Sequence, residues 1–235
     1  MGVMMLDSMK KIILLIAVIT LISIGQNKAQ RTVNIGLYVD PAIEFAITPN
    51  LDKNKGIGGG IGYGLMVDWD ISDRFALNTG LGGSYRTFRV ENKSLYALKS
   101  TYYDSDIAIA MLPNSISKYK LQYLELPINL KLKTNDINNY NIYALVGITN
   151  RFNLGARANI KPGGNKDAAF DAKVKKDVFF YDVPFNVGAG IHWFLKDNLR
   201  AVAGIEYSHG LIDITKSDNS RVTLSEIKLR LGVLF

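Results

Sequence analysis

Strict alternation of apolar and polar residues is the feature that most restricts the fold of this 235-residue chain. It is clearest at the C-terminus, where residues 227–235 read IKLRLGVLF and every second residue is apolar. A period of two indicates a β-strand with one apolar face. Eight segments follow this pattern: 32–45, 57–70, 75–90, 119–133, 141–154, 181–195, 199–213 and 222–235. Each reaches the roughly 9–11 residues with which a tilted strand crosses a membrane.

The connections between these segments alternate in length. The longer, polar ones are residues 46–56, 91–118, 155–180 and 214–221, and the short ones are 71–74, 134–140 and 196–198. Outer-membrane barrels have short periplasmic turns and longer extracellular loops. Only a closed barrel satisfies every backbone polar group of a sheet in hydrocarbon. We therefore expect an all-β fold, an antiparallel up-and-down transmembrane β-barrel of about eight strands, with both termini on the periplasmic side.

The N-terminal segment has a different pattern. Two lysines precede an uncharged, mostly apolar run over 12–24 and a short polar stretch that holds Ala29. A basic start, a short apolar run and a small residue near the end are typical of an export signal. We expect residues 1–30 to be a cleaved signal peptide, with Met9 as an alternative start, and residues 31–235 to form the barrel domain.

Composition excludes several other classes of protein. The chain has no cysteine, which excludes disulfides, thiolate metal sites and a lipid-bearing cysteine after the signal. Beyond the N-terminal run, no segment has the roughly 20 apolar residues of a membrane-spanning helix. The net charge of +7 is scattered along an exported chain, so we expect no nucleic-acid partner.

Charged residues lie at the inward positions of the expected strands. Glu125, Glu206 and Glu226 share the inward phase, and arginines and lysines can face the same interior. An unpaired buried charge is costly, so the two signs should form paired networks. We expect a structural lumen network, and a filled interior rather than a pore, from Glu125, Lys131, Arg200, Glu206, Glu226, Lys228 and Arg230, with Arg86 and Arg151 facing the same space.

Two other patterns are better explained by the barrel than by catalysis. The stretch KGIGGGIGYG lacks the lysine and hydroxyl residue of a phosphate loop, and its alternate glycines leave room on one strand face. Ser208 and His209 are adjacent and point to opposite faces, while His192 lies near the other end of its strand. We therefore expect no catalytic residue. The sequence has few side chains in metal-binding patterns, so we also expect no metal and no cofactor.

Aromatic and basic residues mark the expected membrane boundaries. Aromatics fall beside the short turns at Trp69, Phe75, Tyr140, Trp193, Phe194 and Phe235, and a second group suits the opposite rim at Tyr63, Tyr85, Tyr119, Phe152 and Tyr207. The loop over 155–180 carries six basic residues against three aspartates. It either meets lipopolysaccharide phosphates or an acidic partner, or is simply solvated.

The end of the chain resembles the signal read by the bacterial barrel-assembly machinery. Arg230, Gly232 and Phe235 fit a polar, glycine, aromatic spacing, although a further aromatic at the final step is missing. The resemblance implies that Gly232 and Phe235 serve as an assembly signal and that this machinery is a partner during insertion.

The whole of residues 31–235 resembles the PorT-type small outer-membrane β-barrels of Bacteroidota. The likeness rests on QYLELPINLKLK at 122–133, on the glycine-alternating strand, on the GLIDI stretch and on Phe235. It implies a barrel in the cell outer membrane. We expect this barrel to be monomeric and in contact with outer-membrane lipid and lipopolysaccharide, with an interaction or structural role through its outer loops. Its partner is then an envelope or secretion-system protein. An accessory of type IX secretion, a lipid-modifying enzyme and a narrow channel remain alternatives.

Overall fold

The computed structural model describes residues 33–48, 53–54, 56–91, 96–102, 105–111, 113–161, 170–196, 199–216 and 222–235. The expected signal peptide lies outside these residues. The described strands form one sheet: β1 (Val33–Ile47), β2 (Lys53–Asn54), β3 (Gly58–Asp70), β4 (Phe75–Glu91), β5 (Tyr96–Tyr102), β6 (Ser105–Met111), β7 (Ile116–Lys133), β8 (Tyr140–Lys161), β9 (Phe170–Lys173), β10 (Tyr181–Asp182), β11 (Pro184–Lys196), β12 (Leu199–Gly210) and β13 (Thr223–Leu234).

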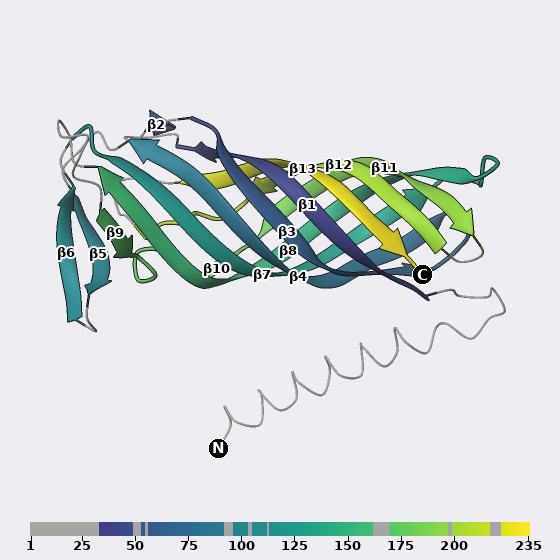
Figure 1. Ribbon diagram of the computed structural model, residues 1–235, viewed down its shortest axis with the longest axis horizontal. Helices are drawn as coiled ribbons and strands as arrows, with labels where there is room; N and C mark the ends of the chain where they lie inside the picture. Colours follow the sequence, from purple (N-terminus) through teal and green to yellow (C-terminus); the bar gives the residue numbers. More distant parts are fainter. Residues whose placement is uncertain are drawn as a thin grey trace, which may run out of the picture. The chain divides into compact units, whose positions relative to one another are not determined.

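Eight of these strands close into a cylinder (Figure 1). Each pairs antiparallel with the next in the order β1, β3, β4, β7, β8, β11, β12, β13, and β13 pairs back onto β1. The eight-stranded antiparallel barrel expected from the alternation is therefore confirmed. Among the described residues, no helix is long and apolar enough to span a membrane.

Side chains alternate between the two sides of the barrel wall. On β7, the outward residues Leu124 to Leu132 are 37–44% exposed, whereas the inward Glu125, Asn129 and Lys131 are at most 3% exposed. The outward face is thus apolar and the inward face polar, as the sequence predicts. On β7 we call residues 124–133, and the barrel at their level, the turn half, and residues 116–123 with their surroundings the loop half.

The loop half contains more strand than the sequence predicts. Residues 155–161 and 116–118 were expected in loops but extend β8 and β7, and the segment 91–118 includes the hairpin β5–β6. β8 has 22 residues. At about 3.3 Å per residue it is roughly twice as long as a membrane crossing requires. The outward face becomes polar beyond Leu154 while pairing continues, which is why the expected boundary was too early.

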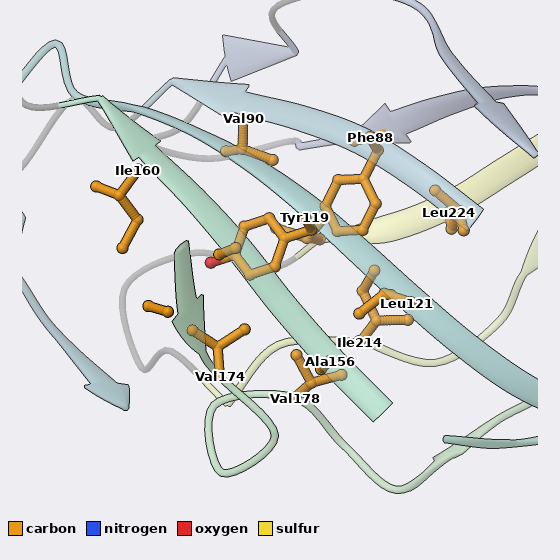
Figure 2. Close-up of a cluster of buried hydrophobic side chains, with 14 of the residues drawn as sticks. Phe88, Val90, Tyr119, Leu121, Ala156, Ile160, Val174, Val178, Ile214 and Leu224 are labelled. Carbon is orange, nitrogen blue, oxygen red and sulfur yellow. The ribbon is translucent and has the colours of Figure 1, made fainter. Parts of the chain in front are cut away.

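The interior of the loop half is an apolar cluster (Figure 2). Phe88 and Tyr119 stack with ring centroids 5.0 Å apart. Tyr119 therefore lies inside, and its expected place on the aromatic rim is wrong. Loop segments contribute as well, since the backbone N–H of Val174 donates to Ala156 and that of Ile214 to Val222. The cluster consists of Ala46, Phe88, Val90, Tyr119, Leu121, Tyr123, Ala156, Ala158, Ile160, Ala172, Val174, Val178, Ile214, Val222 and Leu224.

Glycines make room for large side chains in the turn half. A Cβ at Gly204 would lie 2.4 Å from the hydroxyl of Tyr143, and one at Gly82 would lie 2.1 Å from that of Tyr38. A Cβ at Gly232 would lie 2.5 Å from the methyl group of Met66. These positions therefore exclude any side chain while the aromatic or methionine neighbour keeps its place.

Candidate functional site in the barrel interior

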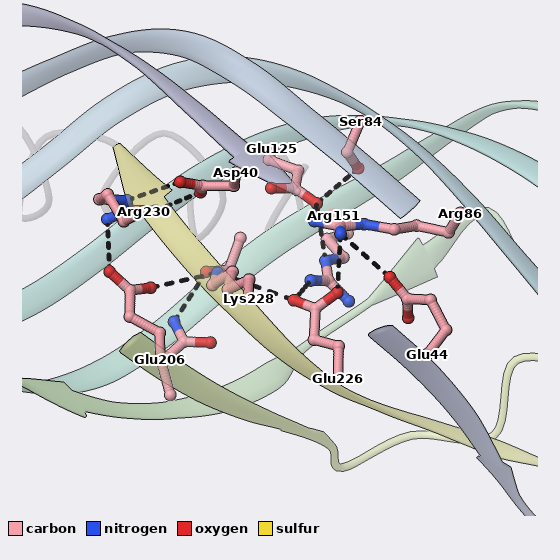
Figure 3. A network of polar contacts seen from close by, with 12 residues as sticks. Asp40, Glu44, Ser84, Arg86, Glu125, Arg151, Glu206, Glu226, Lys228 and Arg230 are labelled. Atoms are coloured by element: carbon pink, nitrogen blue, oxygen red, sulfur yellow. Dashed lines mark hydrogen bonds and ion pairs between the residues drawn. The ribbon is translucent and has the colours of Figure 1, made fainter. Parts of the chain in front are cut away.

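Two arginines form the centre of a buried ion network (Figure 3). Arg86 Nη1 lies 3.0 Å from Glu44 Oε1 and 3.1 Å from Glu226 Oε2, and its Nη2 lies 3.3 Å from Glu125 Oε1. Arg151 Nε lies 3.0 Å from the same Glu125 oxygen, and its Nη2 donates to Glu226. Both arginines are 0% exposed. Glu125 and Glu226 are therefore each held between the two guanidinium groups, and Glu44 contacts Arg86.

The network continues toward the turns through two more cations. Lys228 Nζ lies 3.3 Å from Glu206 Oε2 and 3.7 Å from Glu226 Oε1. Arg230 Nη1 lies 2.8 Å from Glu206 Oε1. On its other side, Arg230 donates to both carboxylate oxygens of Asp40, at 3.1 and 2.7 Å. This fork geometry is the strong, directional form of an ion pair.

The network spans the interior of the barrel. Its members come from β1, β4, β7, β8, β12 and β13, six of the eight barrel strands. β3 faces it with glycines, because a Cβ at Gly60 would lie 2.6 Å from Glu44 Oε1 and 2.9 Å from Arg86 Cδ. The alternate glycines of this strand thus make space for an arginine, which agrees with the structural interpretation of KGIGGGIGYG.

A second polar cluster lies nearer the turns. Lys131 Nζ lies 2.6 Å from Asp68 Oδ2 and 3.5 Å from His192 Nε2. Asn78 donates to the other Asp68 oxygen at 2.6 Å. The ring of Tyr143 stacks on His192 with centroids 4.6 Å apart and also lies under the Lys131 ammonium. This cluster fills the lumen below the ion network with hydrogen-bonded and aromatic groups.

Six of the seven residues expected to form the lumen network are buried and paired. Glu125, Glu206, Glu226, Lys228 and Arg230 lie in the central network, and Lys131 lies in the cluster nearer the turns. Arg200 is the exception among the seven. It lies at the turn end of the barrel, where its guanidinium carbon is 5.1 Å from the ring centroid of Phe194.

Sequence reasoning missed the acidic residues of two strands. Asp40 and Glu44 on β1 and Asp68 on β3 are each at most 2% exposed. All three occupy even-numbered positions, which is the inward phase that the alternation already assigned to those strands. Their phase was therefore a usable signal.

The residues that suggest hydrolysis are placed far from an accessible site. Ser208 and His192 are both 0% exposed, near opposite ends of neighbouring strands. His209 points to the other face and its Nδ1 lies 2.8 Å from Ser225 Oγ, a pair that the sequence did not reveal. Ser225 is also 0% exposed, so its hydroxyl is closed to a substrate. Within the described part of the chain, no group of three or more acidic or histidine side chains is arranged to hold a metal ion.

The two residues of the expected assembly signal lie on the last strand and just beyond it. Gly232 faces Met66 in the interior, and Phe235 is 57% exposed with its backbone N–H donating to Ile35 at 2.8 Å.

Comparison with known families gives a match over most of the chain. A family model described as outer membrane protein beta-barrel domain matches residues 25–216. No curated protein matches the sequence.

Several solved structures resemble the fold at low identity. Neisserial surface protein A is 13% identical with a TM-score of 0.42, covering 86% of this chain and 97% of that one. Ail, the attachment invasion locus protein of Yersinia pestis, is 14% identical with a TM-score of 0.37, covering 86% and 99%. The outer membrane protease OmpT of Escherichia coli is 7% identical with a TM-score of 0.42, covering 89% and 99%. These low scores carry no argument about function.

Proposed function

Because this chain belongs to the family of outer membrane protein beta-barrel domains and lies in the outer membrane, we propose that it works as a non-conducting barrel with a structural or interaction role. Its working surface is then the loop end of the cylinder. The single observation that carries the proposal is the ion network across the lumen, since Arg86 on β4 and Arg151 on β8 both bind Glu226 on β13, a strand that neighbours neither of them. A solute would have to separate these pairs in order to pass.

The apolar cluster of the loop half supports the same proposal. It lies above the ion network and includes residues from the wall and from loop segments, such as Leu121 at 0% and Ile214 at 1% exposure. Ions are not stabilised among apolar side chains. Two layers of opposite chemistry therefore obstruct the same path.

Single-channel recording tests the closed lumen. The purified barrel, reconstituted in a planar lipid bilayer, should show no conductance steps. Regular steps in the wild-type protein, lost on heat unfolding, would instead support the narrow channel.

Crosslinking tests the interaction role. The chain has no cysteine, so single cysteines can be placed for labelling without background. Cysteines at the exposed Asn114 and Lys216 of the loop end should give a discrete crosslinked species in intact cells, and one at the exposed Asp73 of a short turn serves as the control. The interaction role is contradicted if all three positions behave alike.

A role as a type IX secretion accessory is a second candidate, based on the PorT-type resemblance of Tyr-Leu-Glu-Leu-Pro at 123–127. Tyr123 and Glu125 of this motif are inward and buried, and Glu125 bridges the two central arginines. The motif therefore supports a similar barrel interior in this chain and the PorT-type barrels more directly than it supports a similar function. Deletion of the chain should block export of cargo carrying the type IX C-terminal signal if this candidate is correct, and normal export would remove it.

A further inference from the structure

A row of cations crosses the outer surface of the loop half. In the sheet register, Lys120 on β7 lies directly opposite Arg157 on β8, and Arg157 lies opposite Lys173 on β9. Lys175 follows two residues later. Like charges directly opposite each other on neighbouring strands are destabilising. The arrangement is therefore unfavourable unless anions offset it.

The contacts of Lys120, Arg157 and Lys175 offset only part of the charge of these three residues. Asp171 is shared, because its Oδ2 lies 3.0 Å from Arg157 Nη1 and its Oδ1 lies 3.9 Å from Lys120 Nζ. Lys120 also donates to the neutral Asn159 at 3.2 Å, and Lys175 donates to the backbone oxygen of Leu154 at 3.1 Å. The side chains of Lys120, Arg157 and Lys175 thus lie close together, and the carboxylate of Asp171 is shared by the first two.

The same cations line a hollow in the surface. Its volume is about 410 Å³. Among the residues that the structure describes, the lining includes four cations and no acidic residue: Tyr85, Lys120, Gln122, Gly155, Ala156, Arg157, Lys173 and Lys175. A β-bulge makes the space. The register passes from Tyr123↔Asn153 to Gln122↔Gly155, so Leu154 is an extra residue and Gly155 presents no side chain.

The hollow lies directly above the apolar outer face of β7. Lys120 is four residues beyond Leu124, the last of the outward leucines. Four residues at a strand tilt of about 45° place Lys120 roughly 9 Å above that apolar edge. The headgroup layer of a bilayer begins at the edge of the hydrocarbon and is about 5–8 Å deep on each side. The backbone of Lys120 therefore lies just beyond the headgroup layer, from where a long lysine side chain can reach the lipid phosphates.

The neighbouring surface is apolar and aromatic. Leu154 is 56% exposed, and Phe180 is 60% exposed. Phe152 lies against Phe180 and Tyr181, with ring centroids 5.8 and 5.4 Å away. Such a surface is typical of the membrane interface, where one ligand meets charged and apolar groups together.

We propose that this hollow binds the phosphate groups of lipopolysaccharide in the outer leaflet, with the acyl chains lying along the outward leucines of β7. Short turns of outer-membrane barrels face the periplasm, so the loop half faces the leaflet that holds this lipid. Guanidinium and ammonium groups converging on one space are the donors that phosphate prefers. The inference rests on membership of the barrel family and does not depend on a closed lumen.

Binding to the detergent-solubilised full-length barrel tests the proposal. Native mass spectrometry would measure its occupancy by lipopolysaccharide, by the same lipid with its lipid A phosphates removed, and by inorganic phosphate. We expect the phosphorylated lipid to bind at least about tenfold more tightly than the dephosphorylated one, since one charge-assisted hydrogen bond is worth about that factor. The affinity should also fall as salt rises.

A triple variant and its control identify the site. Lys120→Gln, Arg157→Gln and Lys173→Gln together should weaken lipid binding by at least about tenfold. Arg74→Gln removes one exposed charge beside a short turn, outside the hollow, and should leave binding unchanged. Equal binding of both lipids, or equal binding by wild type and triple variant when both show the gel mobility of a folded barrel, overturns the proposal. Inorganic phosphate that competes as well as the intact lipid assigns the site to free phosphate and overturns it too.

Discussion

The two halves of this barrel have opposite chemistry. In the turn half, the outward face is apolar, as at Leu130, and the inside carries charges, as at Arg151. In the loop half, the outward face carries cations such as Lys118 and Lys120, and the inside holds apolar side chains such as Leu121 and Phe88. The same strands, β4, β7 and β8, run through both halves, so the change occurs within a single strand.

This inversion follows from what surrounds each half. A wall in hydrocarbon needs apolar side chains outside, and its polar residues must then pair inside. A wall in water can place charges outside, which leaves the interior free to pack as an ordinary apolar core. The loop half is therefore built like a soluble β-barrel that continues a membrane barrel.

The largest effect should come from removing a central cation of the turn half. Arg151→Leu leaves Glu125 and Glu226 with one arginine partner fewer in a water-poor interior, and breaking a buried pair costs about 3–5 kcal/mol. Urea unfolding in lipid vesicles, followed by gel mobility, measures the loss. Arg157→Leu changes the same residue type on the exposed surface and should cost less than about 1 kcal/mol. If the two substitutions lower the free energy of unfolding by the same amount, the contrast between the buried Arg151 and the exposed Arg157 is contradicted.

The next effect concerns the apolar interior of the loop half. Leu121→Ala removes a fully buried side chain and should lower the free energy of unfolding by about 3 kcal/mol. Leu124→Ala, three residues along β7 on the outward face, is the matched control and should cost about 2 kcal/mol, because lipid fills the space left by the smaller side chain and no cavity is added to the lost apolar transfer. Protease resistance of residues in the loop half should decrease only for the first variant. A larger loss for Leu124→Ala would show that the loop half has no core of its own.

A charge placed on the outward face should distinguish the two environments. Ile128→Lys puts an ammonium among outward apolar residues of the turn half, and we expect a cost of about 2 kcal/mol in a bilayer. Gln122→Lys on the same face of β7, at the rim, should cost less than about 1 kcal/mol. Vesicle unfolding measures both. If the two substitutions cost the same, the apolar band extends higher than the outward leucines.

The smallest effect tests close packing inside the turn half. Gly204→Ala adds a Cβ that would lie 2.4 Å from the Tyr143 hydroxyl, and such overpacking costs about 1–2 kcal/mol. Gly59→Ala, whose Cβ would meet nothing nearer than 4.0 Å, is the control. Tyr143→Phe removes the oxygen and should restore much of the loss in the double variant. Failure of this rescue would assign the cost to the backbone of β12 instead.

Much of the turn half could be predicted from sequence because lipid imposes a strict rule on it. The alternation located all eight barrel strands and the inward phase of Glu125, Glu206 and Glu226. The loop half followed no such rule. There β8 runs on to Lys161, since outside water tolerates many side chains and the pattern loses contrast. Tyr119 has the same odd, inward phase on β7 as Glu125, so its phase was a signal that the expected rim position overlooked.

The inward or outward phase of a residue does not tell which other inward side chain it pairs with. Alternation tells which residues face inward, but the pairing of Arg230 with Asp40 crosses the seam between β13 and β1 and depends on strand tilt and register. The pair of His209 with Ser225 depends on register in the same way. The basic hollow needed a further detail, the bulge at Leu154, which leaves no signature in the hydrophobic pattern.

The seam between β1 and β13 has a consequence for how the barrel is made. It joins Gly36 to Leu234, and the N–H of Phe235 donates to Ile35. Closing a loop of this length costs about 5 kcal/mol of chain entropy, several times the contribution of one hydrogen bond. A few seam contacts therefore cannot persist alone. We expect neighbouring hairpins to assemble first, and the cylinder to shut in one cooperative step when the two outermost strands meet.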